Sequence, residues 1–229
     1  MSKKIILNQE WKENYQYDEA IKTLRTNIQF SGTNIHVIMM TSAMPDEGKS
    51  QTTLSFASSL AQIGNKVLLI DADVRKSVFA TRYHLAQSVD GLSQYLSGQK
   101  TKDDVVYETN INNMDIIFAG PLSPNPTELL EEPLFKKLLD WARQVYDYVI
   151  IDTPPMANLI DGAIIAPHCD GAILVVESGA TSYKLVQKVK VQLERTGCRI
   201  LGTVLNRVNM QEQGYYRHHG KYGKYYRYE

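Results

Sequence analysis

One short segment of the chain carries residues that could bind phosphate. Residues 43–50, AMPDEGKS, fit the pattern A-x-x-x-x-G-K-S and lie between an apolar run and a stretch with helical spacing. In such a loop, backbone N–H groups and the helix N-terminus hold phosphate oxygens, Lys49 reaches the β and γ phosphates, and the Ser50 hydroxyl binds Mg²⁺. Ala43 stands where glycine is usual, which is acceptable if its φ is negative. The expected nucleotide contacts are Ala43, Met44, Pro45, Asp46, Glu47, Gly48, Lys49, Ser50 and Gln51.

Three aspartates that follow apolar runs could bind a metal ion. Asp71 and Asp73 come directly after KVLLI (66–70), and Asp152 ends DYVIID (147–152). An isolated aspartate at such a place is as often part of a turn or a helix cap. Beside a phosphate-binding loop, however, the hard oxygen ligands that Mg²⁺ needs favour a metal-nucleotide site, with Asp152 as the aspartate of Walker B type.

Short apolar runs and helical stretches alternate and indicate the framework around these residues. Continuous apolar runs, typical of strands covered on both faces, lie at 37–40, 66–70, 114–118, 147–152, 171–176 and 199–205. Helical stretches at 49–63, 127–145 and 182–196 separate several of them. We expect an α/β fold with a doubly wound, mostly parallel sheet flanked by helices. Ligands should bind at the carboxyl ends of its strands.

The chain divides into three expected parts. Residues 1–34 form an N-terminal extension whose apolar positions between 18 and 30 have helical spacing, residues 35–207 form the nucleotide-binding domain, and residues 208–229 form a flexible tail. The tail holds six of the fourteen tyrosines among glycines, histidines and bases, so a buried core cannot account for them. They are Tyr215, Tyr216, Tyr222, Tyr225, Tyr226 and Tyr228.

Bulk properties exclude some functional classes. Lys+Arg and Asp+Glu balance at 25 each, so overall charge gives no argument for nucleic acid or an anionic membrane as a partner. Cys169 and Cys198 lie in apolar stretches without C-x-x-C spacing, which suits a reducing cytoplasm. The start of the chain has too short an apolar run for a signal peptide, and we expect no membrane-spanning segment.

The order of A-x-x-x-x-G-K-S, LLIDADVR, VIIDTPP and a tyrosine-rich C-terminus resembles the bacterial tyrosine kinases of capsular and exopolysaccharide synthesis, over nearly the whole chain. The resemblance implies a P-loop NTPase fold of the deviant-Walker ATPase type. It also implies an ATP-dependent protein-tyrosine kinase that autophosphorylates the six tail tyrosines in trans and regulates polysaccharide synthesis and export. The cofactors would be ATP and Mg²⁺, with Lys49 and Asp71 catalytic, Asp71 as the base. Ser50, Asp73 and Asp152 would hold the metal.

The same resemblance suggests further contacts. Asn206 and Arg207, after the last strand, resemble the family's adenine-side residues, although a capping or surface role remains open. Glu19, Lys22 and Arg25 resemble the ExxRxxR motif of the subunit contact in ring-shaped oligomers. Lys22 departs from that motif and lacks the planar fork of arginine, and a solvated helix face is the alternative.

The absence of a spanning segment resembles the split form of the family, whose kinase is cytoplasmic. A separate membrane-anchored protein would then activate this chain and recruit it peripherally to the membrane. A ring-like homo-oligomer and a cognate phosphotyrosine phosphatase are the other expected partners, and nucleic acid is not expected.

Two alternatives remain open. A partitioning or cell-division ATPase would hydrolyse ATP as a switch, but those proteins carry a signature lysine five residues before the catalytic one, where this chain has Met44. A nucleic-acid-binding module would use interleaved aromatics and bases, yet would have no need of three aspartates at strand ends.

Overall fold

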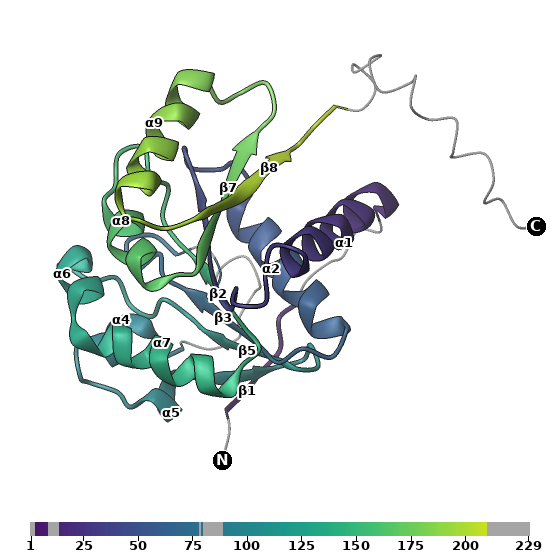
Figure 1. Ribbon diagram of the computed structural model, residues 1–229. Coiled ribbons are helices and arrows are strands. Elements are labelled where there is room, and N and C mark those ends of the chain that lie inside the picture. The colour runs from purple at the N-terminus through teal and green to yellow at the C-terminus, as the bar shows by residue number, and fades with distance from the viewer. Residues whose placement is uncertain (1–2, 9–13, 78, 80–88, 210–229) are drawn as a thin grey trace, which may run out of the picture.

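A single mostly parallel sheet forms the centre of the computed structural model, which describes residues 3–8, 14–77, 79 and 89–209 (Figure 1). The strands of this described part are β1 (Lys3–Ile5), β2 (Val37–Ser42), β3 (Val67–Asp71), β4 (Tyr107–Thr109), β5 (Met114–Ile117), β6 (Tyr148–Asp152), β7 (Gly171–Glu177) and β8 (Ile200–Asn206). Their order across the sheet is β1-β4-β5-β3-β6-β2-β7-β8, and only the β4–β5 pair is antiparallel. The predicted doubly wound α/β fold is confirmed. Each of the six predicted apolar runs coincides with a strand, and their bounds agree to within two residues.

The helices that the structure describes are α1 (Tyr15–Gln29), α2 (Lys49–Gln62), α4 (Leu92–Leu96), α5 (Lys102–Val105), α6 (Pro126–Glu131), α7 (Pro133–Val145), α8 (Asp161–Ile165), the 3₁₀ helix η1 (Ala166–His168) and α9 (Tyr183–Arg195). The single helix predicted over 127–145 was wrong, because α6 ends before Glu132, whose ψ of 140° is extended. Pro133 disfavours the helical conformation in the residue before it and is well placed as the first residue of α7.

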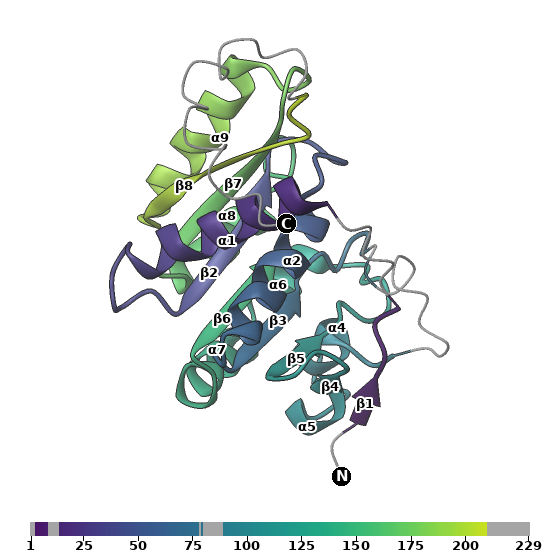
Figure 2. The same ribbon diagram turned by 90° about the vertical axis from the view of Figure 1, so that its right-hand side faces the viewer.

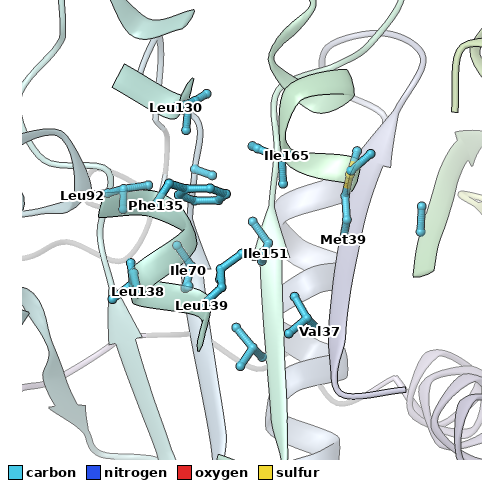
Figure 3. Packing of buried hydrophobic residues seen from close by; sticks show 14 of the residues in the cluster. Val37, Met39, Ile70, Leu92, Leu130, Phe135, Leu138, Leu139, Ile151 and Ile165 are labelled. Atoms are coloured by element: carbon cyan, nitrogen blue, oxygen red, sulfur yellow. The ribbon is translucent and has the colours of Figure 1, made fainter. Parts of the chain in front are cut away.

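Two apolar layers pack on the two faces of the sheet. Strand residues alternate between them, so Val37 and Met39 face one layer while Ile38 and Met40 face the other. In Figure 3, Phe135, Leu138 and Leu139 of α7 lie beside Ile70 and Ile151. The opposite face is covered by α2, with α1 lying along α2 (Figure 2). Burial on both faces explains why the central strands read as continuous apolar runs.

The segment before residue 35 is attached to the rest of the protein through two elements. β1 pairs in parallel with β4 at one border of the sheet. On α1, the Tyr17 hydroxyl lies 3.1 Å from Ser55 Oγ of α2, and Arg25 Nη1 donates to the Ser59 carbonyl at 2.9 Å. The division of the chain at residues 34 and 207 stays a prediction, and nearly all of the tail lies outside the described residues.

Within the described ranges, no helix has both the length and the apolar composition needed to cross a membrane.

Candidate active site

The predicted phosphate-binding loop connects β2 to α2 and brings a helix N-terminus to the carboxyl end of the sheet. Gly48 precedes α2 with a φ of 81°, and a Cβ atom there would lie 2.1 Å from Asn206 Nδ2, so the position requires glycine. Ala43 is fully buried and is not among the described non-glycine residues with positive φ. The replacement of the usual glycine by Ala43 is therefore compatible with this backbone.

Asp152 is the centre of a buried polar cluster at the end of β6. Its side chain is 1% exposed, and Lys49 Nζ lies 2.8 Å from Oδ1. Ser50 Oγ donates to Oδ2 at 2.7 Å, and Thr53 Oγ1 donates to Oδ1 at 2.9 Å. The structure thus brings together three of the predicted site residues. Sequence reasoning did not single out Thr53, although its position one helical turn after Lys49 places it on the same face of α2.

Asp71 ends β3 directly beside Asp152, because the two residues are partners in the β3–β6 register. Its side chain is fully buried and accepts hydrogen bonds from the backbone N–H of Asp73 at 3.2 Å and from the Ser77 hydroxyl. Burial, and next the negative charge of Asp152, raise the pKa of Asp71 to about 7. A carboxyl group with this pKa exchanges its proton near neutral pH. Ser77 has no motif in the sequence that would mark it as part of the site.

Asp73 lies in the turn beyond β3 and is half-buried. Its Oδ1 accepts a hydrogen bond from the Lys76 backbone N–H at 2.9 Å, and among the described contacts its carboxylate touches neither Ser50 nor Asp152. No group of three or more His, Cys, Asp or Glu side chains within the described residues could by itself hold a metal ion. In nucleotide sites, however, Mg²⁺ is held by one or two carboxylates together with substrate phosphates and waters. The oxygen donors at this edge fit that requirement.

Glu47 connects the phosphate-binding loop to the ends of β7 and β8. It is 2% exposed and accepts hydrogen bonds from the Met44 N–H at 2.7 Å, the Glu177 N–H at 3.2 Å and the Thr181 hydroxyl. The Asn206 side-chain amide donates to the Glu47 carbonyl at 2.9 Å. The bonds to Glu177, Thr181 and Asn206 fix the loop against two neighbouring strands, and they join positions too far apart in the sequence to have been predicted.

The remaining predicted site residues take varied places. Arg207 directly follows β8, has a φ of 56° and pairs with Glu177 at 2.8 Å, with half of its side chain exposed. Glu19 and Lys22 form an exposed pair at 2.7 Å, whereas Arg25 binds Ser59 of its own chain. The adenine-side and subunit-contact roles of these residues stay predictions. The six tail tyrosines lie outside the described residues.

Comparisons with known proteins agree with this geometry. A family model described as an AAA domain matches residues 35–197. Tyrosine-protein kinase CpsD of Streptococcus agalactiae is 40% identical over 224 residues, which is 98% of this chain and 97% of that protein. The solved kinase domain of the Escherichia coli tyrosine kinase ETK superposes with a TM-score of 0.81 at 35% identity, covering 86% of this chain and 77% of that one.

A more distant likeness shows the fold alone. The septum site-determining protein MinD of Pyrococcus horikoshii, solved with Mg-ADP, has a TM-score of 0.65 and 24% identity, over 78% of this chain and 72% of that one. The tyrosine kinases match more of the chain at higher identity, which favours the kinase interpretation over the ATPase-switch alternative. This chain belongs to the bacterial tyrosine-protein kinase family.

Proposed function

We propose that this chain transfers the γ-phosphoryl group of ATP to tyrosine hydroxyls, first on other copies of itself, and thereby regulates capsular or exopolysaccharide synthesis and export. The observation that carries the proposal is the pairing of two buried aspartates with a phosphate-binding loop. Asp71 and Asp152 are register partners at adjacent strand ends, and Lys49 and Ser50 contact the second of them. This arrangement supports catalysis by positioning and charge neutralisation, which is how phosphoryl transfer is usually accelerated.

The residues of the loop would hold the nucleotide. Lys49 and the backbone N–H groups at the start of α2 would bind phosphate oxygens, and Lys49 would exchange its contact with Asp152 for one with the phosphates. Ser50, Asp73 and Asp152 would hold Mg²⁺, directly or through water. When bound, the ion would neutralise charge on the phosphates. Asn206 and Arg207 would lie on the adenine side.

Asp71 would act as the base that accepts the phenolic proton. A phenol has a pKa of about 10, so at neutral pH it needs a proton acceptor as it attacks. Because the pKa of Asp71 is raised to about 7, a large fraction of this carboxyl group is ionised at pH 7.5 and is still basic enough to take a proton. The role requires that the substrate gain access to a side chain that is fully buried in this structure.

Phosphotyrosine analysis of the full chain incubated with γ-labelled ATP tests the proposal. The expected result is label on tyrosine in the parent and none in Lys49→Met. Label recovered only as inorganic phosphate would support the ATPase-switch alternative instead. The exposed Lys136, which pairs with Asp140 on α7, offers a control, since Lys136→Met should retain the parent's activity.

The tail tyrosines are the proposed acceptors. Four bases, Arg217, Lys221, Lys224 and Arg227, would draw the tail toward the acidic and phosphate-bearing site of a neighbouring subunit. Each phosphorylation adds about −1.5 to −2 charges, so two or three events would outweigh the four bases and loosen the assembly. A chain with all six tyrosines changed to Phe should stay oligomeric in MgATP, while the parent dissociates. Mass spectrometry and size-exclusion chromatography of the same samples check both points, and phosphate found mainly outside residues 215–228 contradicts the role.

We also propose a membrane-anchored activator and a cognate phosphotyrosine phosphatase as partners of a cytoplasmic kinase. The family to which the chain belongs supports this proposal. Activity of the isolated chain should rise when the cytoplasmic segment of a membrane partner is added, and vesicles carrying that partner should retain the chain. Full activity that no membrane extract changes would count against the activator.

A further inference from the structure

The turn that carries Asp71 and Asp73 is closed by its own hydrogen bonds. The Asp73 N–H donates to Asp71 Oδ1 at 3.2 Å, the Lys76 N–H donates to Asp73 Oδ1 at 2.9 Å, and the Ser77 hydroxyl donates to Asp71 Oδ2. These bonds fix the shape of the turn over residues 71–77. The Ala72 N–H also donates to the Asp152 carbonyl at 2.8 Å, which joins the start of the turn to the end of β6. None of these bonds reaches the segment that follows Asp152.

Arg75 extends from this turn and binds two other elements. Its Nε donates to both carboxylate oxygens of Asp161, at 3.0 Å each, and its Nη2 donates to Thr127 Oγ1 at 2.7 Å. Asp161 is the first residue of α8, and Thr127 belongs to α6. Because α8 follows β6, the contact with Asp161 connects the turn after β3 to the segment after β6. Asp73 lies in the first of these segments, and the two strands from which they continue end in Asp71 and Asp152.

The burial of this pair makes the connection specific. Asp161 is fully buried, whereas the Arg75 side chain is 32% exposed. Arg75 is the cationic partner that the described contacts give to Asp161, and a buried carboxylate without such a partner is strongly unfavourable. The guanidinium can also contact Thr127 at the same time through its fork, which a lysine ammonium cannot reproduce.

We propose that Arg75 is a positioning residue for phosphoryl transfer: through Asp161 and Thr127 it holds the turn that carries Asp73, beyond the point where strand pairing fixes Asp71 and Asp152. The inference rests on the proposed function, because it assigns to Arg75 the alignment of Asp73 with the other groups that would hold Mg²⁺. A change at Arg75 should therefore impair catalysis and Mg²⁺-dependent nucleotide binding. Nucleotide binding without metal, which depends on the phosphate-binding loop, should be affected less.

A second arginine–aspartate pair provides a matched control. At the opposite end of the sheet, Arg143 Nη1 and Nη2 bind Asp170 at 2.7 and 2.9 Å, and the Arg143 side chain is also 32% exposed. Arg143→Lys therefore removes the guanidinium of a side chain that is as exposed as that of Arg75 but lies far from the site carboxylates. Both lysine variants should lower the melting temperature, so a purely structural role for Arg75 would make the two variants alike in every other measurement.

The test uses the full chain and two kinds of measurement. Arg75→Lys should lower kcat about 10- to 100-fold, the range seen when groups behind a metal site are changed, with a smaller effect on KM for ATP. By calorimetry, the ratio of ADP affinity with Mg²⁺ to that in EDTA should fall toward one, while the affinity in EDTA stays within about twofold of the parent. Arg143→Lys should leave all three quantities within about twofold, as expected for a pair remote from the site.

Two further variants keep the inference open to contradiction if Arg75→Lys folds poorly. Thr127→Val should reproduce part of the loss, and Thr127→Ser, which retains the hydroxyl, should restore it. Arg75→Gln combined with Asp161→Asn leaves no buried unpaired charge, so it should fold and still show the reduced magnesium ratio. A magnesium ratio and kcat equal to those of Arg143→Lys would overturn the inference. If the parent transfers no phosphate to tyrosine, the proposed function fails, but the ADP measurements still decide the role of Arg75.

Discussion

At the amino end of the sheet, Asp147 and Asp170 accept hydrogen bonds from backbone N–H groups, whereas at the carboxyl end Asp71 and Asp152 are bound mainly by side-chain hydroxyl and ammonium groups. Asp147 accepts from the Lys66 N–H at 2.7 Å. Asp170 accepts from the N–H groups of His36 and Val37 and pairs with Arg143. The amino-end carboxylates hold the starts of strands in place. Those at the carboxyl end have partners that a phosphate or a metal ion could replace.

The pKa shifts at the two ends have opposite directions. Burial alone would raise the pKa of Asp170, but the Arg143 guanidinium and the backbone N–H groups outweigh it and hold that pKa below its ordinary value. At Asp71, burial and the charge of Asp152 dominate, and the pKa rises to about 7. Folding therefore favours the ionised form of the aspartate at the amino end and the protonated form of the aspartate at the carboxyl end. Burial pushes both pKa values upward, but at Asp170 the arginine and the backbone donors outweigh it, whereas at Asp71 the charge of Asp152 adds to it.

The largest expected contrast between the two ends comes from Lys49→Met. This change removes both a phosphate contact and a charge that stabilises the transition state, so kcat/KM should fall by at least about 10⁴-fold. Circular dichroism should show an intact fold, since Lys49 serves the site and not the apolar core. Nucleotide binding measured by calorimetry should disappear with it, and autophosphorylation at the parent's rate would remove the basis of the assignment.

A matched pair of substitutions compares the aspartates directly. Asp71→Asn should keep ATP affinity and lower kcat about 10²–10⁴-fold, because it removes the base. Asp147→Asn, at the amino end, should leave kcat unchanged and lower the free energy of unfolding by about 1 kcal/mol through a weaker hydrogen bond to Lys66. Steady-state kinetics and urea unfolding separate the two. An equal loss of ATP affinity in Asp71→Asn would make Asp71 a metal ligand instead of the base.

The pH dependence of stability should also differ between the ends. Because the pKa of Asp71 is raised from 3.8 to about 7 on folding, the folded chain keeps a proton that the unfolded chain loses, and its contribution to stability falls as pH rises through this interval. In EDTA, Asp71→Asn should therefore gain stability over the parent by about 2–4 kcal/mol at pH 8, and by much less at pH 4. The contribution of Asp170 has the opposite sign: it is present above pH 3.8 and is lost in acid. A stability gain for Asp71→Asn that does not change with pH would contradict this account.

The smallest expected effect concerns the link between Glu47 and the end of β7. Thr181→Val removes one hydrogen bond to the Glu47 carboxylate and should raise KM for ATP about 3- to 10-fold with little change in kcat. The hydroxyl of Thr196, at the other end of α9, donates to the Leu193 carbonyl and accepts from the Cys198 N–H, so its described contacts stay close to its own turn and away from the loop. Thr196→Val should therefore leave KM unchanged. Equal KM values for the two variants would show that Glu47 does not need Thr181 to hold the loop.

Much of the fold and part of the candidate site could be predicted from the sequence, for a common physical reason. Strands buried on both faces must be apolar throughout, so the sequence shows where each of them ends. In a parallel sheet the residues that follow these strands lie together at the carboxyl edge. Lys49, Ser50, Asp71 and Asp152 were found in this way. β1 and β4, at three residues each, are too short to give a pattern.

The parts that could not be predicted depend on contacts between distant residues. The pairing of Arg75 with Asp161 spans 86 positions and that of Thr181 with Glu47 spans 134, and neither has a local signature. Arg25 shows the same limit. No feature of the sequence indicated that its guanidinium binds Ser59 of its own chain, while the predicted contact with another subunit stays a prediction. Pro133, in contrast, does indicate a break between α6 and α7. The apolar periodicity on both sides of it nevertheless favoured a single helix.

The buried pair of Arg75 and Asp161 also has a consequence for how sequences of this family can diverge. Losing either residue alone would leave a charge without its partner, at Asp161 in a site with no exposure, so a lineage that changes one position should change the other at nearly the same time. Arg143 and Asp170 are less constrained, because Asp170 keeps two backbone donors when the arginine is replaced. Among related chains, substitutions at 75 and 161 should therefore be correlated more strongly than those at 143 and 170.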